Sequence, residues 1–245
     1  MKILFSPSET KSDISPFEND IRDELFFKEL FSKREIFIKK YDEILKSGDE
    51  DKIKKLFGLK NIANFDTASL FEKLTQKAIL RYSGVAYKHL NYKTLNSNEQ
   101  NFIDENVIIF SNLFGPILAK NKIPNYKLQQ GETIDNLKPE ITYQNVFKSR
   151  LDEFVKDEFI IDLRAEFYEK FYQVDSLYTS LKFLKNGKIV SHFAKVYRGL
   201  VLRELAKFQP KNEREFGEIR LENLNLIEIK QFKNKKEYLF EITKL

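Results

Sequence analysis

The chain has 245 residues, of which 42% are hydrophobic and 14% aromatic, so it is long and apolar enough to bury a core and is not intrinsically disordered. Its formal net charge of +5 permits contact with polyanions without requiring it. Cysteine is absent and histidine occurs only at His89 and His192, which excludes disulfides, thiolate zinc sites and a cysteine nucleophile and makes a histidine-rich metal site unexpected.

Helices are predicted wherever apolar residues recur at a period close to that of the α-helix. The first predicted helix is long, begins near Asn19 and ends at Gly48, and Asp66 and Thr67 are suitable N-caps for another. In chain order, the expected helices cover residues 19–47, 51–56, 66–80, 96–104, 143–156, 164–172 and 192–205.

Strands are predicted where apolar and β-branched residues run together or alternate with polar ones. Buried strands are expected at residues 2–6, 107–110 and 158–163. In the C-terminal third, Asn186-Gly187 separates two such runs and predicts a hairpin with a type I′ turn over residues 177–193. A second hairpin is expected over residues 224–242.

These helices and strands interleave without a regular βαβ order, and no repeat, linker or low-complexity segment divides the chain. We therefore expect one mixed α/β domain over residues 1–245, with a mixed sheet flanked by helices and with C-terminal hairpins. The N-terminal segment becomes polar after a few residues, and no apolar run approaches membrane-spanning length. A cytoplasmic protein without membrane contact is expected.

The segment "HFAKVYRGLVLREL" from His192 to Leu205 predicts an amphipathic helix with a basic face. With Lys195 as the origin, Arg198 lies about 60° to one side and Arg203 about 80° to the other, so the three cations share one broad face. Two interpretations remain: a solvated face with weak surface ion pairs, or a phosphate-binding face that uses the planar arginine groups. Gly199 costs the helix about 1 kcal/mol relative to alanine, which indicates close approach of a backbone or ligand beside Arg198.

A second candidate phosphate site is the segment "KKLFGLKNIANF", residues 54–65. The spacing of Leu56, Gly58 and Ala63 resembles a helix-hairpin-helix element, in this case near residues 51–65, whose backbone amides bind phosphate. Lys60 adds positive charge beside it. The alternative interpretation is that Gly58 only ends a helix.

Evidence for catalysis is weak in the sequence. It contains no P-loop, no dinucleotide fingerprint and no H-E-x-x-H motif, and Asp162 at the end of a buried strand is explained as a capping residue. Ser191 and His192, expected in a strand, would point to opposite faces and could not pair. No catalytic residue, metal site or cofactor is assigned.

Several stretches, taken in order, carry the signature residues of a known family. The matching residues are Ser6, Pro7, Thr10, Gly84, Tyr87, Leu90, Ser111, Leu113, Gly115, Tyr126, Leu128 and Gly131, followed after the "KNGK" of residues 185–188 by Ser191, Ala194, Lys195, Arg198, Gly199, Leu200 and Arg203. Through them, nearly the whole chain resembles the bacterial YaaA family of peroxide-stress proteins, as a divergent member.

The departures from the family pattern are as informative as the matches. Glu9 replaces a lysine, with Lys11 nearby, and Lys127 replaces an arginine. The other replaced residues, which put in doubt any function that needs the originals, stand at Val85, Leu118, Ala119, Lys120, Asn121 and Gln129.

The resemblance implies a single mixed α/β domain with a helix-hairpin-helix-like element and a basic cleft that binds DNA. It also implies a role in surviving peroxide by limiting unincorporated iron and DNA damage. On this first hypothesis the protein, expected to be a monomer, binds the DNA backbone without strong sequence specificity. The phosphate contacts would be Lys195, Arg198, Arg203, Lys127, Gly58 and Lys60.

The second hypothesis is an enzyme that acts on a nucleotide or another phosphorylated small molecule bound in the same cleft. Ser6, Thr10 and Lys11 would stand near the phosphate, because ligands favour the carboxyl ends of strands. Direct iron binding is a third and weaker hypothesis, since two histidines and no cysteine leave few suitable ligands.

Overall fold

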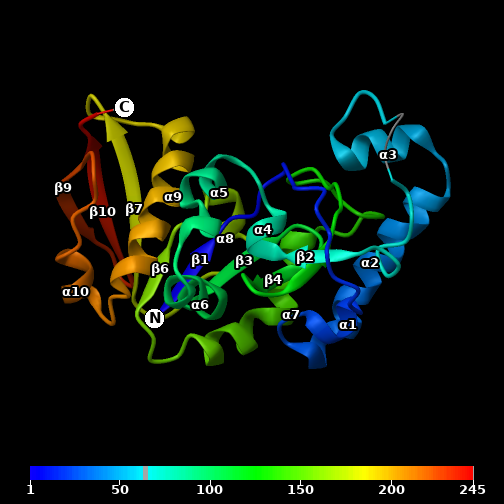
Figure 1. Cartoon of the computed structure of the whole chain (residues 1–245), viewed down its shortest axis with the longest axis horizontal. Coiled ribbons are helices and arrows are strands. Elements are labelled where there is room, and N and C mark those ends of the chain that lie inside the picture. Colours follow the sequence, from blue (N-terminus) through cyan, green and yellow to red (C-terminus); the bar gives the residue numbers. More distant parts are fainter. Residues whose placement is uncertain (63–65, 245) are drawn as a thin grey trace.

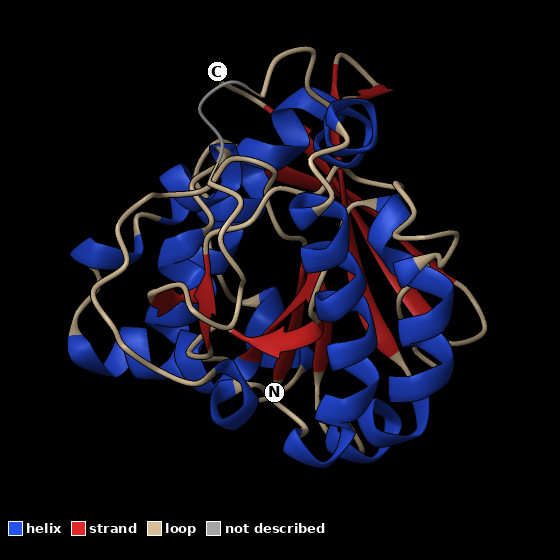
Figure 2. Ribbon diagram, turned by 90° about the vertical axis from the view of Figure 1, so that its right-hand side faces the viewer, coloured by secondary structure: helices blue, strands red, loops and turns tan. Residues whose placement is uncertain are grey.

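The computed structural model describes residues 1–62 and 66–244, with only the backbone of Ser191 and His192. Its main sheet has eight strands, and helices lie on both sides of the strands (Figures 1 and 2). The strands are β1 (Lys2–Phe5), β2 (Thr75–Lys77), β3 (Val107–Ser111), β4 (Gly115–Leu118), β5 (Lys122–Pro124), β6 (Ile160–Asp162), β7 (Tyr178–Lys185), β8 (Lys188–Ile189), β9 (Leu224–Gln231) and β10 (Lys235–Ile242). The helices are α1 (Ile21–Glu24), η1 (Lys28–Leu30), α2 (Phe31–Lys46), α3 (Glu50–Phe57), α4 (Ala78–Arg81), α5 (Val85–Leu90), η2 (Tyr92–Thr94), α6 (Ser97–Asn106), α7 (Pro139–Phe154), α8 (Glu166–Glu169), α9 (Ser191–Phe208) and α10 (Glu213–Gly217).

The strand order of the main sheet is β4-β3-β1-β6-β7-β10-β9, with β8 paired to β7. Strands β3, β1, β6, β7 and β10 are parallel, whereas β4, β8 and β9 pair antiparallel with their neighbours. Leu4 of β1 stands opposite Ile108 on one side and Asp162 on the other. The carboxyl ends of β1 and β6 therefore lie next to each other, at the same end of their strands.

The central strands are buried because both of their faces are covered. Ile3, Leu4 and Phe5 of β1 and all five residues of β3 are buried, as their continuous apolar sequences predict. The predicted strands at 2–6, 107–110 and 158–163 and the mixed α/β fold class are therefore confirmed. Both C-terminal hairpins are also confirmed, with Asn186 at φ 51° and Gly187 at φ 72° as a type I′ turn requires.

The single helix expected over residues 19–47 is wrong, because the chain breaks between α1 and α2. Phe27 adopts a left-handed conformation with φ 58°. The side chain of Asn121 holds the break, since it accepts a hydrogen bond from the Phe26 amide (3.1 Å) and donates one to the carbonyl oxygen of Glu24 (2.5 Å). A tertiary contact from 95 residues away thus overrides a helical pattern.

The helix expected over residues 66–80 is also wrong. Asp42 on α2 accepts hydrogen bonds from the Ser69 hydroxyl (2.5 Å) and the Leu70 amide (3.2 Å), which hold this segment in turns. The chain then forms β2, which pairs with β5, and only the short α4 follows. Ser191 and His192, expected in a strand, are instead the first residues of α9.

The structure does not support the helix-hairpin-helix interpretation. Gly58, with φ 65°, ends α3, and its amide and that of Leu59 donate to the carbonyl oxygens of Lys55 (3.2 Å) and Lys54 (3.0 Å). These amides are therefore unavailable to a phosphate. No second helix follows in residues 58–62 or 66–77, and Ala63 lies outside the described residues.

Helix α9 packs closely against α5 at Gly199. A Cβ atom on Gly199 would overlap the carbonyl oxygen of Ala86, so only glycine permits this approach. The close backbone contact expected beside Arg198 is therefore confirmed.

Gly199→Ala is expected to lower the free energy of unfolding by about 1–3 kcal/mol, because the methyl group overpacks the helix contact more than it favours the helix. Urea unfolding of the variant measures this loss. Gly217→Ala is the control, since a Cβ atom there meets nothing within 4 Å. A Gly199→Ala protein as stable as the wild type would contradict the packing argument.

Candidate functional site

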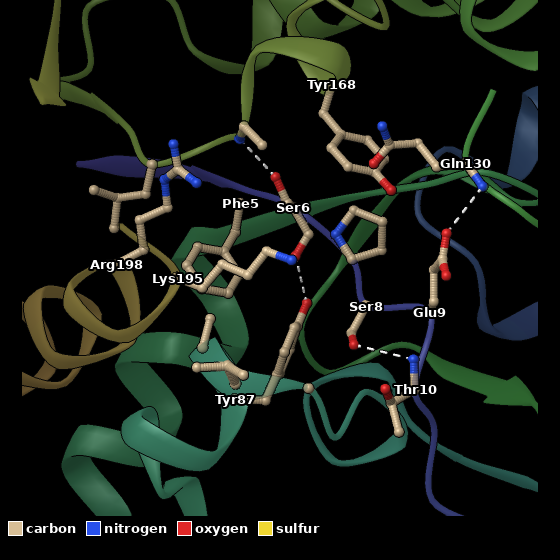
Figure 3. A pocket seen from close by; sticks show the side chains of 16 residues that line it. Phe5, Ser6, Ser8, Glu9, Thr10, Tyr87, Gln130, Tyr168, Lys195 and Arg198 are labelled. Atoms are coloured by element: carbon tan, nitrogen blue, oxygen red, sulfur yellow. Dashed lines mark hydrogen bonds between the residues drawn. The ribbon is translucent and has the colours of Figure 1, made fainter. Parts of the chain in front are cut away.

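A pocket of about 390 Å³, here called the strand-end pocket, opens where β1 and β6 end (Figure 3). The residues that line it come from the end of β1 and the loop after it, the start of α5, the segment between β5 and α7, the segment after β6 and the first turns of α9. They are Phe5, Ser6, Pro7, Ser8, Glu9, Thr10, Gly84, Val85, Ala86, Tyr87, Gln130, Leu163, Ala165, Tyr168, Lys195 and Arg198.

The position of the strand-end pocket follows from the topology of the sheet. From β1 the chain reaches β3 on one side, whereas β6 lies on the other side of β1. Ligands of open α/β sheets bind in the crevice at such a switch in strand order, outside the carboxyl ends of the strands. The pocket therefore occupies the place where a ligand is expected.

Three hydrogen bonds fix the loop that forms one wall of the pocket. The Ser6 hydroxyl accepts from the Ala165 amide (2.8 Å), and the Tyr87 hydroxyl donates to the Ser6 carbonyl oxygen (2.8 Å). The Ser8 hydroxyl accepts from the Thr10 amide (3.2 Å). Within the described residues, the hydroxyl protons of Ser6, Ser8 and Thr10 have no acceptor, so they can bond a ligand.

Lys195 and Arg198 face this loop from α9, on the opposite side of the pocket from Glu9 and Thr10 (Figure 3). Within the described residues, neither side chain has a hydrogen bond or an ion pair. Burial lowers the pKa of Arg198, against the opposing effect of Asp162, Glu166 and Glu169, yet an arginine remains charged in proteins. The pocket therefore offers two unpaired cations and several hydroxyl groups, which is the chemistry that binds phosphate.

Arg203 does not share this site. Its guanidinium donates to the carbonyl oxygens of Leu90 (2.8 Å) and Asn91 (3.2 Å), at the C-terminal end of α5. A cation stabilises the exposed carbonyl groups of a helix C-terminus. Arg198 and Arg203 lie about 140° apart around α9, and the α5–α9 contact separates the two directions.

Lys11 lies beneath the loop rather than in the strand-end pocket. Its ammonium group is 4.1 Å from the centre of the Tyr126 ring and 5.4 Å from that of Tyr82. It donates to the carbonyl oxygens of Ser8 (3.2 Å) and Glu9 (3.4 Å). Burial, with a smaller effect from Lys127, lowers the pKa of Lys11 to about 7.

The remaining predicted phosphate contacts, Lys127, Gly58 and Lys60, do not line the pocket. The backbone of Lys127 exchanges hydrogen bonds with the Tyr41 hydroxyl, at 2.9 and 3.1 Å. Gly58 ends α3, and Lys60 is exposed beyond it. Of the predicted site residues, the structure thus brings together Ser6, Thr10, Lys195 and Arg198.

Sequence reasoning missed the group of residues that supports Tyr168. The buried Arg164 forms an ion pair with Asp162 (2.6 Å) and donates to the carbonyl oxygens of Tyr168 (3.1 Å) and Tyr172 (2.8 Å). This arrangement fixes α8, from which Tyr168 lines the pocket. The signal was the charged pair in "IIDLR", directly after a buried strand, where burial requires the charges to pair.

The described residues contain no group of histidine, aspartate or glutamate side chains that could hold a metal ion. In residues 1–62 and 66–244, no helix is long and apolar enough to span a membrane.

Comparison with known proteins shows the family. The sequence profile of the family described as "Peroxide stress protein YaaA" matches residues 1–230. The chain belongs to the YaaA family. "Uncharacterized protein Cj0984" of Campylobacter jejuni is 44% identical over 245 residues, 99% of each chain. "UPF0246 protein FN1762" of Fusobacterium nucleatum is 27% identical over 98% of each chain, and "UPF0246 protein MYPE6270" of Malacoplasma penetrans is 27% identical over 83% of this chain and 85% of that protein.

The departures from the YaaA pattern fall in different places. Val85 lines the strand-end pocket. Leu118 and Asn121 are buried, and Asn121 holds the break before α2. Gln129 packs over Gly58. Of the departures named above, Glu9 and Val85 are the two among the described residues that line the pocket.

Lys11 predicts a pH dependence of stability. Its pKa in the folded protein, about 7, lies below its ordinary value of 10.5, so above pH 7 the unfolded chain binds more protons than the folded one. From about pH 7 to about pH 9, this group makes the free energy of unfolding rise with pH, by at most about 1.4 kcal/mol per pH unit. Urea unfolding at several pH values measures the slope.

Lys11→Met is expected to remove this part of the slope, whereas Lys60→Met, at an exposed lysine, is expected to keep it. Equal slopes in the wild-type and Lys11→Met proteins would show that Lys11 is not buried in the way described.

Proposed function

We propose that this YaaA family member acts in peroxide stress by binding a phosphate group of its ligand in the strand-end pocket. One observation carries the proposal. Lys195 and Arg198, which have no ion pair in the described residues, lie across the pocket from the hydroxyl groups of Ser6, Ser8 and Thr10. Together they provide the charge and the hydrogen-bond donors that phosphate recognition needs.

The ligand that fits this geometry best is a nucleotide or another phosphorylated small molecule. A volume of about 390 Å³ is in the lower part of the range for small-molecule sites. The apolar lining residues, including Phe5, Leu163 and the ring of Tyr168, suit the non-phosphate part of such a ligand. Glu9 is the one carboxylate among the described lining residues, so binding is better supported than acid–base catalysis.

DNA is the second candidate ligand. Lys195 is exposed at the pocket, and the chain carries a net charge of +5, both of which suit backbone contacts. Under this proposal the protein binds DNA phosphates without strong sequence specificity and so limits iron-driven peroxide damage. Arg203, Gly58 and Lys60 would not contribute to the pocket contacts.

Arg198→Gln is expected to weaken the binding of adenosine monophosphate by about 10- to 100-fold, because a charge-assisted hydrogen bond is lost. Isothermal titration calorimetry measures the dissociation constant. Arg203→Gln is the matched control at another arginine of α9. It is expected to lower stability without changing the affinity. Unchanged affinity in Arg198→Gln, or an equal loss in both variants, would contradict the proposed site.

For DNA, binding of a short duplex is measured as a function of salt concentration. Two phosphate contacts, by Lys195 and Arg198, predict a log–log slope of about −1.8, whereas contacts by Lys195, Arg198 and Arg203 together would give about −2.7. Lys195→Gln is expected to bring the slope to about −0.9, and Lys60→Gln to leave it unchanged. Duplex binding that adenosine monophosphate does not displace would contradict a shared site.

A further inference from the structure

The strand β9 forms one edge of the main sheet, at the end of the molecule away from α3 (Figure 1). Seven of its eight residues pair with β10 on one side, Ile227 forms a bulge in that pairing, and no described strand pairs with the other side. An edge of this length leaves a row of backbone amides and carbonyls open to another strand, and natural proteins usually shorten or cover such edges.

The exposed residues of β9 are unusually apolar for an edge strand. The exposed fractions of Leu226, Ile227 and Ile229 are 47%, 54% and 47%. Leu226 stands opposite Phe240 and Ile229 opposite Tyr238, and both aromatic residues are buried. Because opposite residues of an antiparallel pair share a face, Leu226 and Ile229 continue the face of the sheet that the core covers, whereas Ile227 is the unpaired residue of the bulge between them.

The other face of β9 carries charges of both signs. Glu228 and Lys230 are exposed, two residues apart, and their side-chain charges lie 3.5 Å from each other. A single sign of charge along the edge would repel a second copy. Charges of opposite sign allow one register of self-pairing and disfavour others.

Symmetry selects that register. When two copies pair antiparallel about a two-fold axis, one residue must stand opposite its own counterpart. A pairing shifted by one residue would set side chains of one face opposite side chains of the other face. An axis at Glu228 or Lys230 sets like charges opposite each other. An axis at Ile227 sets Leu226 opposite Glu228. An axis at Ile229 instead sets Ile229 opposite Ile229 and each Glu228 opposite a Lys230.

We propose that two copies of this chain form a dimer through antiparallel pairing of their β9 edges about a two-fold axis at Ile229. The sheet then continues from one copy into the other. Ile229 meets its own counterpart on one face, and two Glu228–Lys230 pairs form on the opposite face. The strand-end pocket, beside β1 and β6, is separated from this edge by β7 and β10 and stays open, so the dimer is independent of the proposed function.

Sedimentation velocity tests the dimer with the full chain from about 1 µM to about 500 µM, a range that covers the affinity of a modest interface. The wild-type protein is expected to shift from monomer to dimer within this range. Ile229→Lys is expected to remain a monomer. Lys188→Glu, an exposed charge reversal on β8, is the control that dimerises like the wild type.

The charged residues provide a test of the register itself. Glu228→Lys and Lys230→Glu are each expected to weaken the dimer at least tenfold, since each creates like-charge pairs across the axis. The double variant E228K/K230E restores opposite charges and is expected to recover dimerisation. Circular dichroism verifies that each variant is folded.

Three results would overturn the proposal. They are a wild-type protein that stays monomeric over the whole range, a dimer that persists in folded Ile229→Lys, and a folded double variant that dimerises no better than the single ones.

Discussion

The site depends on one close contact, between the backbone of α9 at Gly199 and the carbonyl oxygen of Ala86 in α5. Both helices pack beside the end of β1, so their separation decides how near the cations of α9 come to the loop after that strand. A side chain at residue 199 would push α9 away and widen the pocket between Lys195 and Ser6. The same contact directs Arg203 to the end of α5, where it bonds two carbonyl oxygens. One glycine thus separates Arg198, which lines the strand-end pocket, from Arg203, which bonds the end of α5.

Around this contact, the charged groups divide into those that the protein uses itself and those that it leaves free. The buried pair Asp162–Arg164 fixes the segment after β6, and Lys11 supports the loop after β1 through two carbonyl oxygens. Lone buried charges would be costly, so each is paired, hydrogen-bonded or, as for Lys11, moved toward its neutral form by a lowered pKa. Lys195 and Arg198 lack such partners among the described residues. The charged groups that hold the walls of the pocket in place are therefore different from the two cations that the pocket offers to a ligand under the proposal.

The sequence was sufficient for the features that local patterns determine. Continuous apolar runs located β1, β3 and β6, and Asn186-Gly187 located the first hairpin, because burial and turn geometry act over a few residues. It was insufficient where distant groups compete with the local pattern, as when Asn121 breaks the first helix. A helical wheel placed Arg203 and Arg198 on one broad face, but only the neighbouring α5 decides which of the two is free.

The same distinction explains why a small net charge said little about the ligand. Many lysines pair with acids on the surface, for example Lys182 with Glu166 (3.0 Å) and Lys120 with Glu105 (2.7 Å), so an overall excess of +5 does not identify a binding face. What matters is where a cation lacks an internal partner and also borders a concavity. In the described residues, Lys195 and Arg198 meet both conditions at the switch in strand order, and Arg203 and Lys11 do not. The position of two charges relative to the ends of β1 and β6, rather than their number, therefore supports phosphate recognition.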